Sequence, residues 1–144
     1  MATSFQVTFD CADPDRLARF WATALGYRIP APPEGFATWE KWLRELGIPE
    51  EEWNAASAVE DPAGAGPRIF FQRVPERKSI KNRVHLDLNV SGGRAISLTE
   101  RRPRVDAEVE RLVAAGASRV GAHERHEEYW VIMQDPEGNE YCVQ

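Results

Sequence analysis

The residues best suited to chemistry lie in the alternating segment 81–90. Because successive side chains of a β-strand point to opposite faces, this segment predicts a strand with one core face and one polar face. The core face would carry Val84, Leu86, Leu88 and Val90, and the polar face would carry His85, Asp87 and Asn89. On that face His85 could fill space through hydrogen bonds or could move a proton near neutral pH. Both interpretations stay open, and Asp10 and Asp87 could orient its ring.

The first part of the chain predicts a strand followed by a helix. Positions 5–11 alternate between apolar and polar residues, as a half-buried strand requires. Asp13 and Pro14 are typical of a helix start, and Gly26 is typical of a C-terminal cap. Between them runs an apolar stripe at helical spacing: Leu17, Phe20, Trp21, Ala24 and Leu25. A short second strand is expected over 27–29, before a proline-rich stretch ends it.

A tryptophan-rich inserted helix is predicted over about 36–53, with its regular part at 38–46. Trp39 and Trp42 could anchor this helix to the sheet, or they could form an aromatic wall or lid over a pocket. The segments 55–60 and 68–74 then predict a β-hairpin around a turn rich in proline and glycine.

The second half repeats this order. After a flexible stretch through Arg102, an apolar stripe predicts a helix that Gly116 caps, and its members are Val105, Val109, Leu112 and Val113. Strands are expected over 119–123, 128–134 and 140–144. The repeat predicts an α+β fold of two βαβββ modules, each a small sheet with one helix on its outer face.

The modules are expected to form one domain over residues 1–144. Module one spans about 4–75, a basic linker covers 76–82, and module two spans about 83–144. The basic residues of the linker are interpreted as a solvated connection rather than as an anion site.

Composition narrows the classes of partner. The net charge of −5 and the pI near 5.3 argue against affinity for nucleic acid, whose phosphates require a basic surface. No apolar run is long enough for a membrane span, and the first residues do not have the pattern of a secretory signal. We therefore expect a cytoplasmic protein with no nucleic-acid or membrane partner. Cys11 and Cys142 have opposite strand parity and are expected to be free thiols.

Three motifs together resemble the glyoxalase/bleomycin-resistance/extradiol-dioxygenase superfamily, also called the vicinal oxygen chelate superfamily. They are DPDRLARFW at 13–21 with LGY at 25–27, RVHLDL at 83–88, and DPEGNE at 135–140. The resemblance covers nearly the whole chain and is greatest to a glyoxalase-like branch in which Lys-Asn-Arg leads into His-Leu-Asp-Leu. It implies curved sheets around a central cavity with the helices outside, and it makes a homodimer a further expectation.

Enzymes of the superfamily typically hold a divalent metal with one ligand from each of four inner strands. The resemblance places those positions at Gln6, Gln72, His85 and Cys142 in this sequence. Only His85 is a usual ligand at its place, because amide oxygens are weak donors and Cys142 replaces a carboxylate. No metal is therefore favoured, and a divalent metal at these four positions is the alternative.

We expect a metal-independent protein that binds a small, partly apolar organic molecule between its modules. Gln6, Gln72, His85 and Cys142 would line that cavity, with apolar walls from Trp39, Trp42, Phe70 and Trp130. Cys142 is interpreted as a polarizable wall rather than as a nucleophile. The alternative is an enzyme of the superfamily, either a metal-dependent lyase, isomerase or dioxygenase, or a metal-free catalyst of proton transfer through His85. A third hypothesis is an interaction module with a filled cavity.

Overall fold

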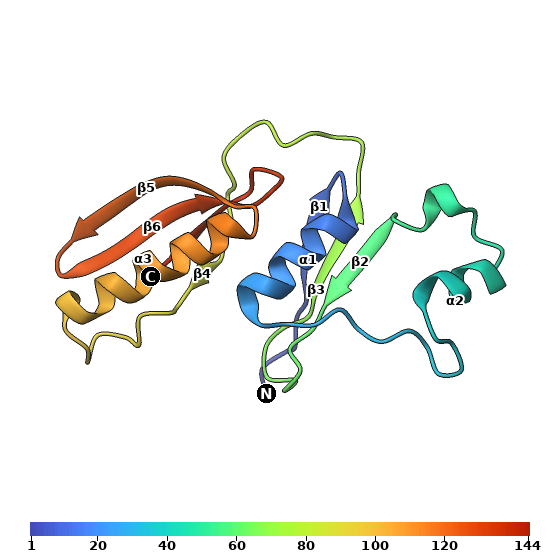
Figure 1. The fold of residues 1–144 in the computed structure, drawn as a ribbon, viewed down its shortest axis with the longest axis horizontal. Coiled ribbons are helices and arrows are strands. Elements are labelled where there is room, and N and C mark those ends of the chain that lie inside the picture. Colours follow the sequence, from blue (N-terminus) through green and yellow to red (C-terminus); the bar gives the residue numbers. More distant parts are fainter. The chain divides into compact units, whose positions relative to one another are not determined.

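The computed structural model describes residues 1–144, which divide into two compact units, Met1–Arg77 (unit 1) and Lys78–Gln144 (unit 2). Each unit has its own β-sheet with a helix packed against one face (Figure 1). The predicted α+β fold class is confirmed. No helix of the chain combines the length and the apolar character that a membrane span requires.

Unit 1 has a three-stranded sheet in the order β1-β3-β2. Strand β3 (Ile69–Arg73) runs parallel to β1 (Val7–Cys11) and antiparallel to β2 (Ala56–Val59), which confirms the predicted hairpin. The short strand predicted over 27–29 does not form a ladder, and it is reduced to one bridge between Arg28 and Glu60. The prolines that follow lack the N–H groups that a ladder needs. The strand predicted from Phe5 begins at Val7, and Phe5 is exposed.

Helix α1 (Pro14–Leu25) forms as its sequence predicts. The Asp13 side chain accepts a hydrogen bond from the Arg16 backbone N–H at 3.2 Å, which satisfies one of the free donors of the first turn. Gly26 ends the helix with φ of 68°, a left-handed conformation that glycine adopts without steric cost. Leu17 and Trp21 are fully buried against the sheet, and such burial stabilises a fold by about 1.5–3 kcal/mol per large apolar side chain.

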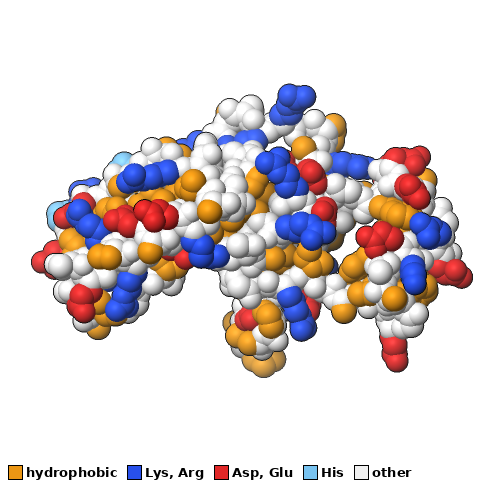
Figure 2. All heavy atoms as spheres, viewed as in Figure 1, with side chains coloured by type: hydrophobic (Ala, Val, Ile, Leu, Met, Phe, Trp, Pro, Cys, Tyr) orange, Lys and Arg blue, Asp and Glu red, His pale blue; other side chains and the backbone are white.

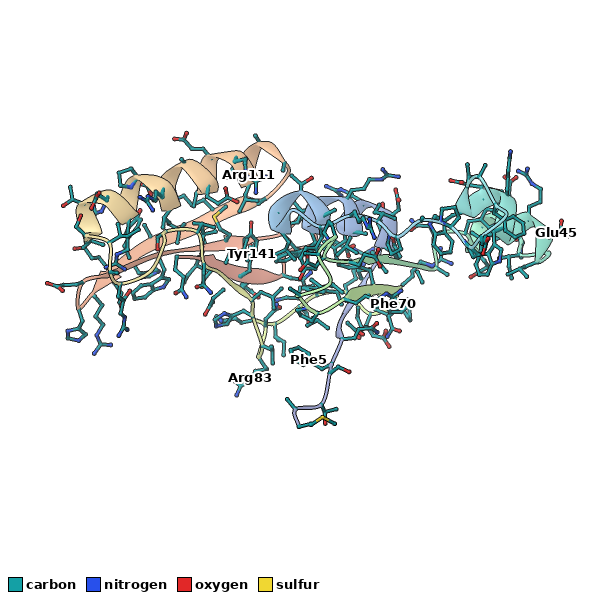
Figure 3. The ribbon with its side chains drawn as sticks, turned by 90° about the horizontal axis from the view of Figure 1, so that it is seen from below. Phe5, Glu45, Phe70, Arg83, Arg111 and Tyr141 are labelled. Carbon is teal, nitrogen blue, oxygen red and sulfur yellow. The ribbon has the colours of Figure 1, made fainter.

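The tryptophan-rich insertion contains helix α2 (Trp39–Glu45) and a 3-10 turn, η1 (Glu50–Glu52). Helix α2 has no buried residue and lies beyond β2, so that Glu45 is far from Phe70 of β3 (Figures 1 and 3). The Trp39 indole N–H donates to the Pro30 carbonyl at 2.8 Å, and its ring meets that of Trp42 edge to face at 5.5 Å. These contacts hold the insertion to the preceding chain, which differs from the expected anchoring on the sheet.

Unit 2 contains the complete βαβββ order. Its four-stranded sheet runs β4-β7-β6-β5, with β4 (Asp87–Leu88) parallel to β7 (Glu140–Val143). Strands β5 (Ser118–Arg125) and β6 (Glu128–Gln134) form an antiparallel hairpin, and β6 also pairs with β7. Helix α3 (Leu98–Ala114) covers one face of this sheet.

The strand predicted over 81–90 shows the largest difference from the sequence analysis, because only Asp87 and Leu88 form ladder pairs. Val84, expected in the core, is 81% exposed. The predicted alternation holds from His85 onward, where Leu86 is half-buried and Leu88 is buried. Before Val84, contacts with the Glu140 side chain of β7 hold the segment, and no ladder pair forms.

Helix α3 begins at Leu98, within the stretch that was expected to be flexible, and Pro103 lies inside it. Val105, Val109 and Leu112 are buried as predicted. Val113 is 45% exposed, so its assignment to the buried stripe is wrong. It follows Leu112 by one residue, and one residue turns about 100° around a helix of 3.6 residues per turn.

The turn at 135–139 fixes where β7 begins. The buried Asp135 carboxylate accepts hydrogen bonds from the backbone N–H groups of Glu137 at 2.9 Å and Asn139 at 3.0 Å. Gly138 adopts φ of 83°. This network confirms the predicted turn and sets the register that brings Cys142 opposite Asp87.

Candidate functional site

The polar face of the unit 2 sheet brings together three groups with chemical potential, His85, Asp87 and Cys142. Asp87 is the register partner of Cys142, and the Cys142 backbone N–H donates to the Leu86 carbonyl at 2.9 Å. Because the strand alternates here, His85 and Asp87 lie on the same side, opposite the buried Leu88. The nitrogen, carboxylate oxygen and sulfur of the three residues all lie within 4.8 Å of one another.

Within this cluster, His85 and Asp87 form a direct pair. The His85 Nδ1 atom lies 3.0 Å from the Asp87 Oδ1 atom, and both side chains are about 40% exposed. The contact fixes the orientation of the imidazole and leaves its Nε2 atom available to a ligand. The alternation of the sequence predicts that His85 and Asp87 share one face of the strand. The direct contact between their side chains is seen only in the structure.

Cys142 is held as a neutral thiol. Partial burial is the main cause that raises the pKa of Cys142 to about 11, and the nearby Asp87 carboxylate raises it further through its charge and a hydrogen bond. A thiol with this pKa is almost fully protonated at neutral pH, so it is a poor nucleophile. The raised pKa argues against a nucleophilic role, and the interpretation of Cys142 as a wall of the site stays a prediction.

Glu140 positions the segment that carries His85, a role that the sequence analysis missed. Its carboxylate accepts the Asn82 backbone N–H at 2.9 Å and pairs with Lys78 Nζ at 3.2 Å. The Asn82 contact is the largest cause that lowers the pKa of Glu140 to about 2, and Lys78 contributes as well. Glu140 is therefore ionised near neutral pH, and it ties residues 78–82 to β7 where no ladder does. Its position on the polar face of β7, two residues before Cys142, was the available signal.

In unit 1, Gln6 and Gln72 do not come together. Val7 pairs with Ile69 and Asp10 pairs with Gln72, so Gln6 and Gln72 lie about four residues apart along the sheet, on the order of 13 Å. The Gln6 Oε1 atom accepts a hydrogen bond from Arg68 Nη1 at 2.6 Å. The Gln72 Nε2 atom donates to Asp10 Oδ1 at 2.7 Å. Both amides therefore already have partners within their own sheet.

The aromatic residues named as pocket walls belong to three different elements. Phe70 is half-buried on β3, on the same face as Gln72, with the Arg68 guanidinium 5.4 Å from its ring centre. Trp39 and Trp42 belong to the insertion described above. Trp130 lies on β6 and stacks on His123 at 5.6 Å. The wall assignments of all four stay predictions.

The four metal positions implied by the resemblance do not supply four ready donors. The Gln6 oxygen is occupied by a guanidinium, whose positive charge disfavours a second cation beside it. Instead, the structure gathers an imidazole, a carboxylate and a thiol in unit 2, which are donor types that Zn²⁺ accepts. His85, Asp87 and Cys142 would thus hold a metal ion in a three-ligand site, if one binds.

Comparison with known proteins supports the fold that the sequence predicts. The sequence model of the glyoxalase-like domain matches residues 6–144. A search of curated proteins finds no match.

Several solved structures resemble the whole chain. A possible glyoxalase from Bacillus cereus has a TM-score of 0.62 at 14% identity, covering 100% of this chain and 99% of its own. A glyoxalase/bleomycin resistance protein/dioxygenase family enzyme from Burkholderia phytofirmans PsJN has a TM-score of 0.60 at 16% identity, covering 96% and 94%. A mutant of the fosfomycin resistance protein FosX from Listeria monocytogenes, complexed with Mn(II) and 1S,2S-dihydroxypropylphosphonic acid, has a TM-score of 0.62 at 12% identity, covering 100% and 92%. At these identities the likeness establishes the fold alone.

Proposed function

We propose that this chain, which belongs to the glyoxalase-like domain family, binds a small, partly apolar organic molecule without requiring a metal ion. The cluster of His85, Asp87 and Cys142 would contact a polar group of that molecule. The observation that carries the proposal is the composition of this cluster, in which an oriented imidazole lies beside a carboxylate and a neutral thiol. Such groups donate and accept hydrogen bonds, which orient an organic ligand.

Unit 1 supports the metal-free form of the proposal. Its two residues at the implied metal positions are engaged by Arg68 and Asp10. A metal that uses donors from both halves would have to break these hydrogen bonds and would meet the Arg68 charge. An organic ligand has no such requirement.

Proton transfer by His85 is the second candidate function. The 3.0 Å contact between Asp87 and the ring would fix one nitrogen as the orienting side and leave Nε2 to exchange a proton with the ligand. The same arrangement orients catalytic histidines in unrelated folds, where a carboxylate holds the ring and stabilises its charged form. A metal ion on His85, Asp87 and Cys142, when bound, would supply a Lewis acid.

The test is a ligand screen on chelator-treated protein, with thermal unfolding as the readout. We expect at least one organic compound to raise the unfolding temperature in the presence of EDTA, because a ligand that binds only the folded state stabilises it. The His85→Gln variant should bind that compound roughly tenfold more weakly, the effect of losing one good polar contact. The Gln72→Leu variant is the matched control in unit 1 and should keep the full response.

Two results would contradict the proposal. Stabilisation by Zn²⁺ or Mn²⁺ alone, with loss of the effect in His85→Gln, would favour a metal site. Equal responses in the wild type and in His85→Gln would remove the cluster from the binding site. For the second candidate, turnover that persists unchanged in His85→Gln would exclude His85 as the proton carrier.

A further inference from the structure

A cavity lies in unit 2 at the turn between β5 and β6, close to where α3 begins. The turn and the start of this helix lie side by side at the left of Figure 1. The volume of the cavity is about 580 Å³, which is within the range of pockets that hold small organic ligands. Arginines line it from three segments: Arg94 from the loop before α3, Arg101 from α3, and Arg125 from the end of β5, next to His126 of the turn. Glu127, Glu128 and Trp130 complete the lining of this hairpin pocket. Basic, histidine and acidic side chains crowd this end of unit 2, at the left in Figure 2.

The carboxylates of the hairpin pocket only partly balance its guanidinium groups. Glu128 forms ion pairs with two arginines. Its Oε1 atom lies 2.5 Å from Arg94 Nε, and its Oε2 atom lies 3.2 Å from Arg101 Nη1. The Arg101 hydrogen bond is the main cause that lowers the pKa of Glu128, which is therefore ionised. Arg125 forms no ion pair. With Glu127 as the second carboxylate, the pocket keeps a net positive charge.

Arg101 is the buried cation of the hairpin pocket, and only 7% of its surface is exposed. Its Nη2 atom donates to the Glu127 carbonyl at 2.5 Å, but its buried Nε atom has no hydrogen-bond partner. A buried charged group is costly unless its donors are satisfied. Because Arg101 lines the cavity, an anion bound there would stabilise this incompletely satisfied guanidinium through its charge.

Trp130 adds an aromatic surface to the same pocket. Its ring stacks on His123 at 5.6 Å with an interplanar angle of 19°. Its indole N–H is a free donor. An inorganic anion would make no apolar contact with the indole, whereas a planar ring bearing the anion would pack beside it.

We propose that the hairpin pocket binds an aryl carboxylate, with the carboxylate on Arg125 and Arg101 and the ring against Trp130. A carboxylate matches the forked donors of a guanidinium, which makes such contacts both strong and directional. This site is distinct from the cluster of His85, Asp87 and Cys142, and it stands whether or not that cluster binds a ligand.

The experiment is an NMR titration of the full chain with benzoate, following the indole N–H signals of the tryptophans. The Trp130→Phe variant identifies the Trp130 signal. We expect benzoate to move that signal in a saturable way, and we expect the neutral benzamide, which has nearly the same shape, to bind at least tenfold more weakly because it lacks the charge.

Arg125→Gln is the informative variant, because Arg125 has no ion pair whose loss would disturb the fold. Its affinity for benzoate should fall roughly tenfold. Arg102→Gln is the matched control: Arg102 also lies in this region, but it pairs with Glu124 and does not line the pocket. This variant should bind benzoate as the wild type does, and the dispersion of the NMR signals verifies that both variants are folded.

Several results would overturn the proposal. They are the absence of a benzoate-induced shift, benzamide binding as tightly as benzoate, and unchanged affinity in Arg125→Gln. Inorganic phosphate binding as tightly as benzoate would also overturn it, because the ring would then contribute nothing.

Discussion

The two units pair their first, last and second-to-last strands in the same way, but their sheets present different side chains. In both units the first strand runs parallel to the last, and the last pairs antiparallel with the strand before it. An aspartate of the first strand is also the register partner of the last-strand residue at the implied metal position, Asp10 opposite Gln72 and Asp87 opposite Cys142. The strand pairing is therefore repeated in the two units, including these two residue pairs.

The chemistry of the side chains on the two sheets is not repeated. In unit 1 the aspartate and the amide satisfy each other through a 2.7 Å hydrogen bond. In unit 2 the aspartate also orients His85, and the last strand offers a neutral thiol. The comparison teaches that two repeats can share their strand pairing and differ in their polar side chains. In one repeat these side chains satisfy each other, and in the other some of them stay available to a ligand.

The largest effect is expected from matched changes in the two cores. Leu17→Ala in α1 and Leu112→Ala in α3 each remove a fully buried side chain and should cost about 2–5 kcal/mol of unfolding free energy. Urea denaturation measures both. If each change lowers the midpoint of a single transition, the units unfold together. If each shifts a separate transition, the units are energetically independent.

Removal of the Glu140 carboxylate should have the next largest effect. A carboxylate with its pKa lowered to about 2 from its ordinary 4.5 adds stability that is complete above pH 4.5 and is lost as the pH falls toward 2. Glu140→Gln should therefore be less stable than the wild type by about 1–3 kcal/mol at pH 7. The difference should shrink in acid, which thermal unfolding at several pH values would show. A difference that stays constant from pH 7 to pH 3 would contradict this account.

Replacement of Asp87 should alter the thiol beside it. In Asp87→Asn the charge that helps to raise the pKa of Cys142 is gone, while burial, the larger cause, remains. The pKa should fall below 11 and stay above 9.0, so alkylation of Cys142 should speed up at pH 9. Peptide mass spectrometry distinguishes it from the buried Cys11. An unchanged alkylation profile would mean that Asp87 does not act on the thiol.

The smallest effect is expected in unit 1. Gln72→Leu removes an exposed hydrogen bond to Asp10 and should change the unfolding free energy by less than about 1 kcal/mol. A loss of several kcal/mol, measured by urea denaturation, would show that the pair has a structural role that its exposure does not indicate.

Local patterns in the sequence were sufficient to predict much of the fold. The cap residues and apolar stripe of α1, the hairpin of β2 and β3, and the 135–139 turn all depend on neighbouring residues, and all formed as predicted. Val84 and Phe5 were wrongly assigned to the apolar face of a strand, because their burial depends on distant residues. Alternation shows which side chains could share a face, but whether a neighbouring strand extends far enough to cover them depends on distant parts of the chain.

The candidate site was predictable in part. Parity placed His85 and Asp87 on one face, and the resemblance placed Cys142 nearby. Strand parity places Glu140 on the face of Cys142, but its contacts could not be predicted, because its partners lie about 60 residues earlier in an irregular segment. Likewise, the occupation of Gln6 by Arg68 depends on the register of two strands, which no local pattern specifies.

The most direct test of the central claim, that unit 2 offers a metal-free binding cluster, is native mass spectrometry of protein prepared without added metal or chelator. Comparison with a denaturing spectrum shows any mass held noncovalently. The account predicts a retained organic molecule on the wild type that is lost from His85→Gln and kept by Gln72→Leu. One metal ion per chain, retained by the wild type and lost from His85→Gln, would contradict it.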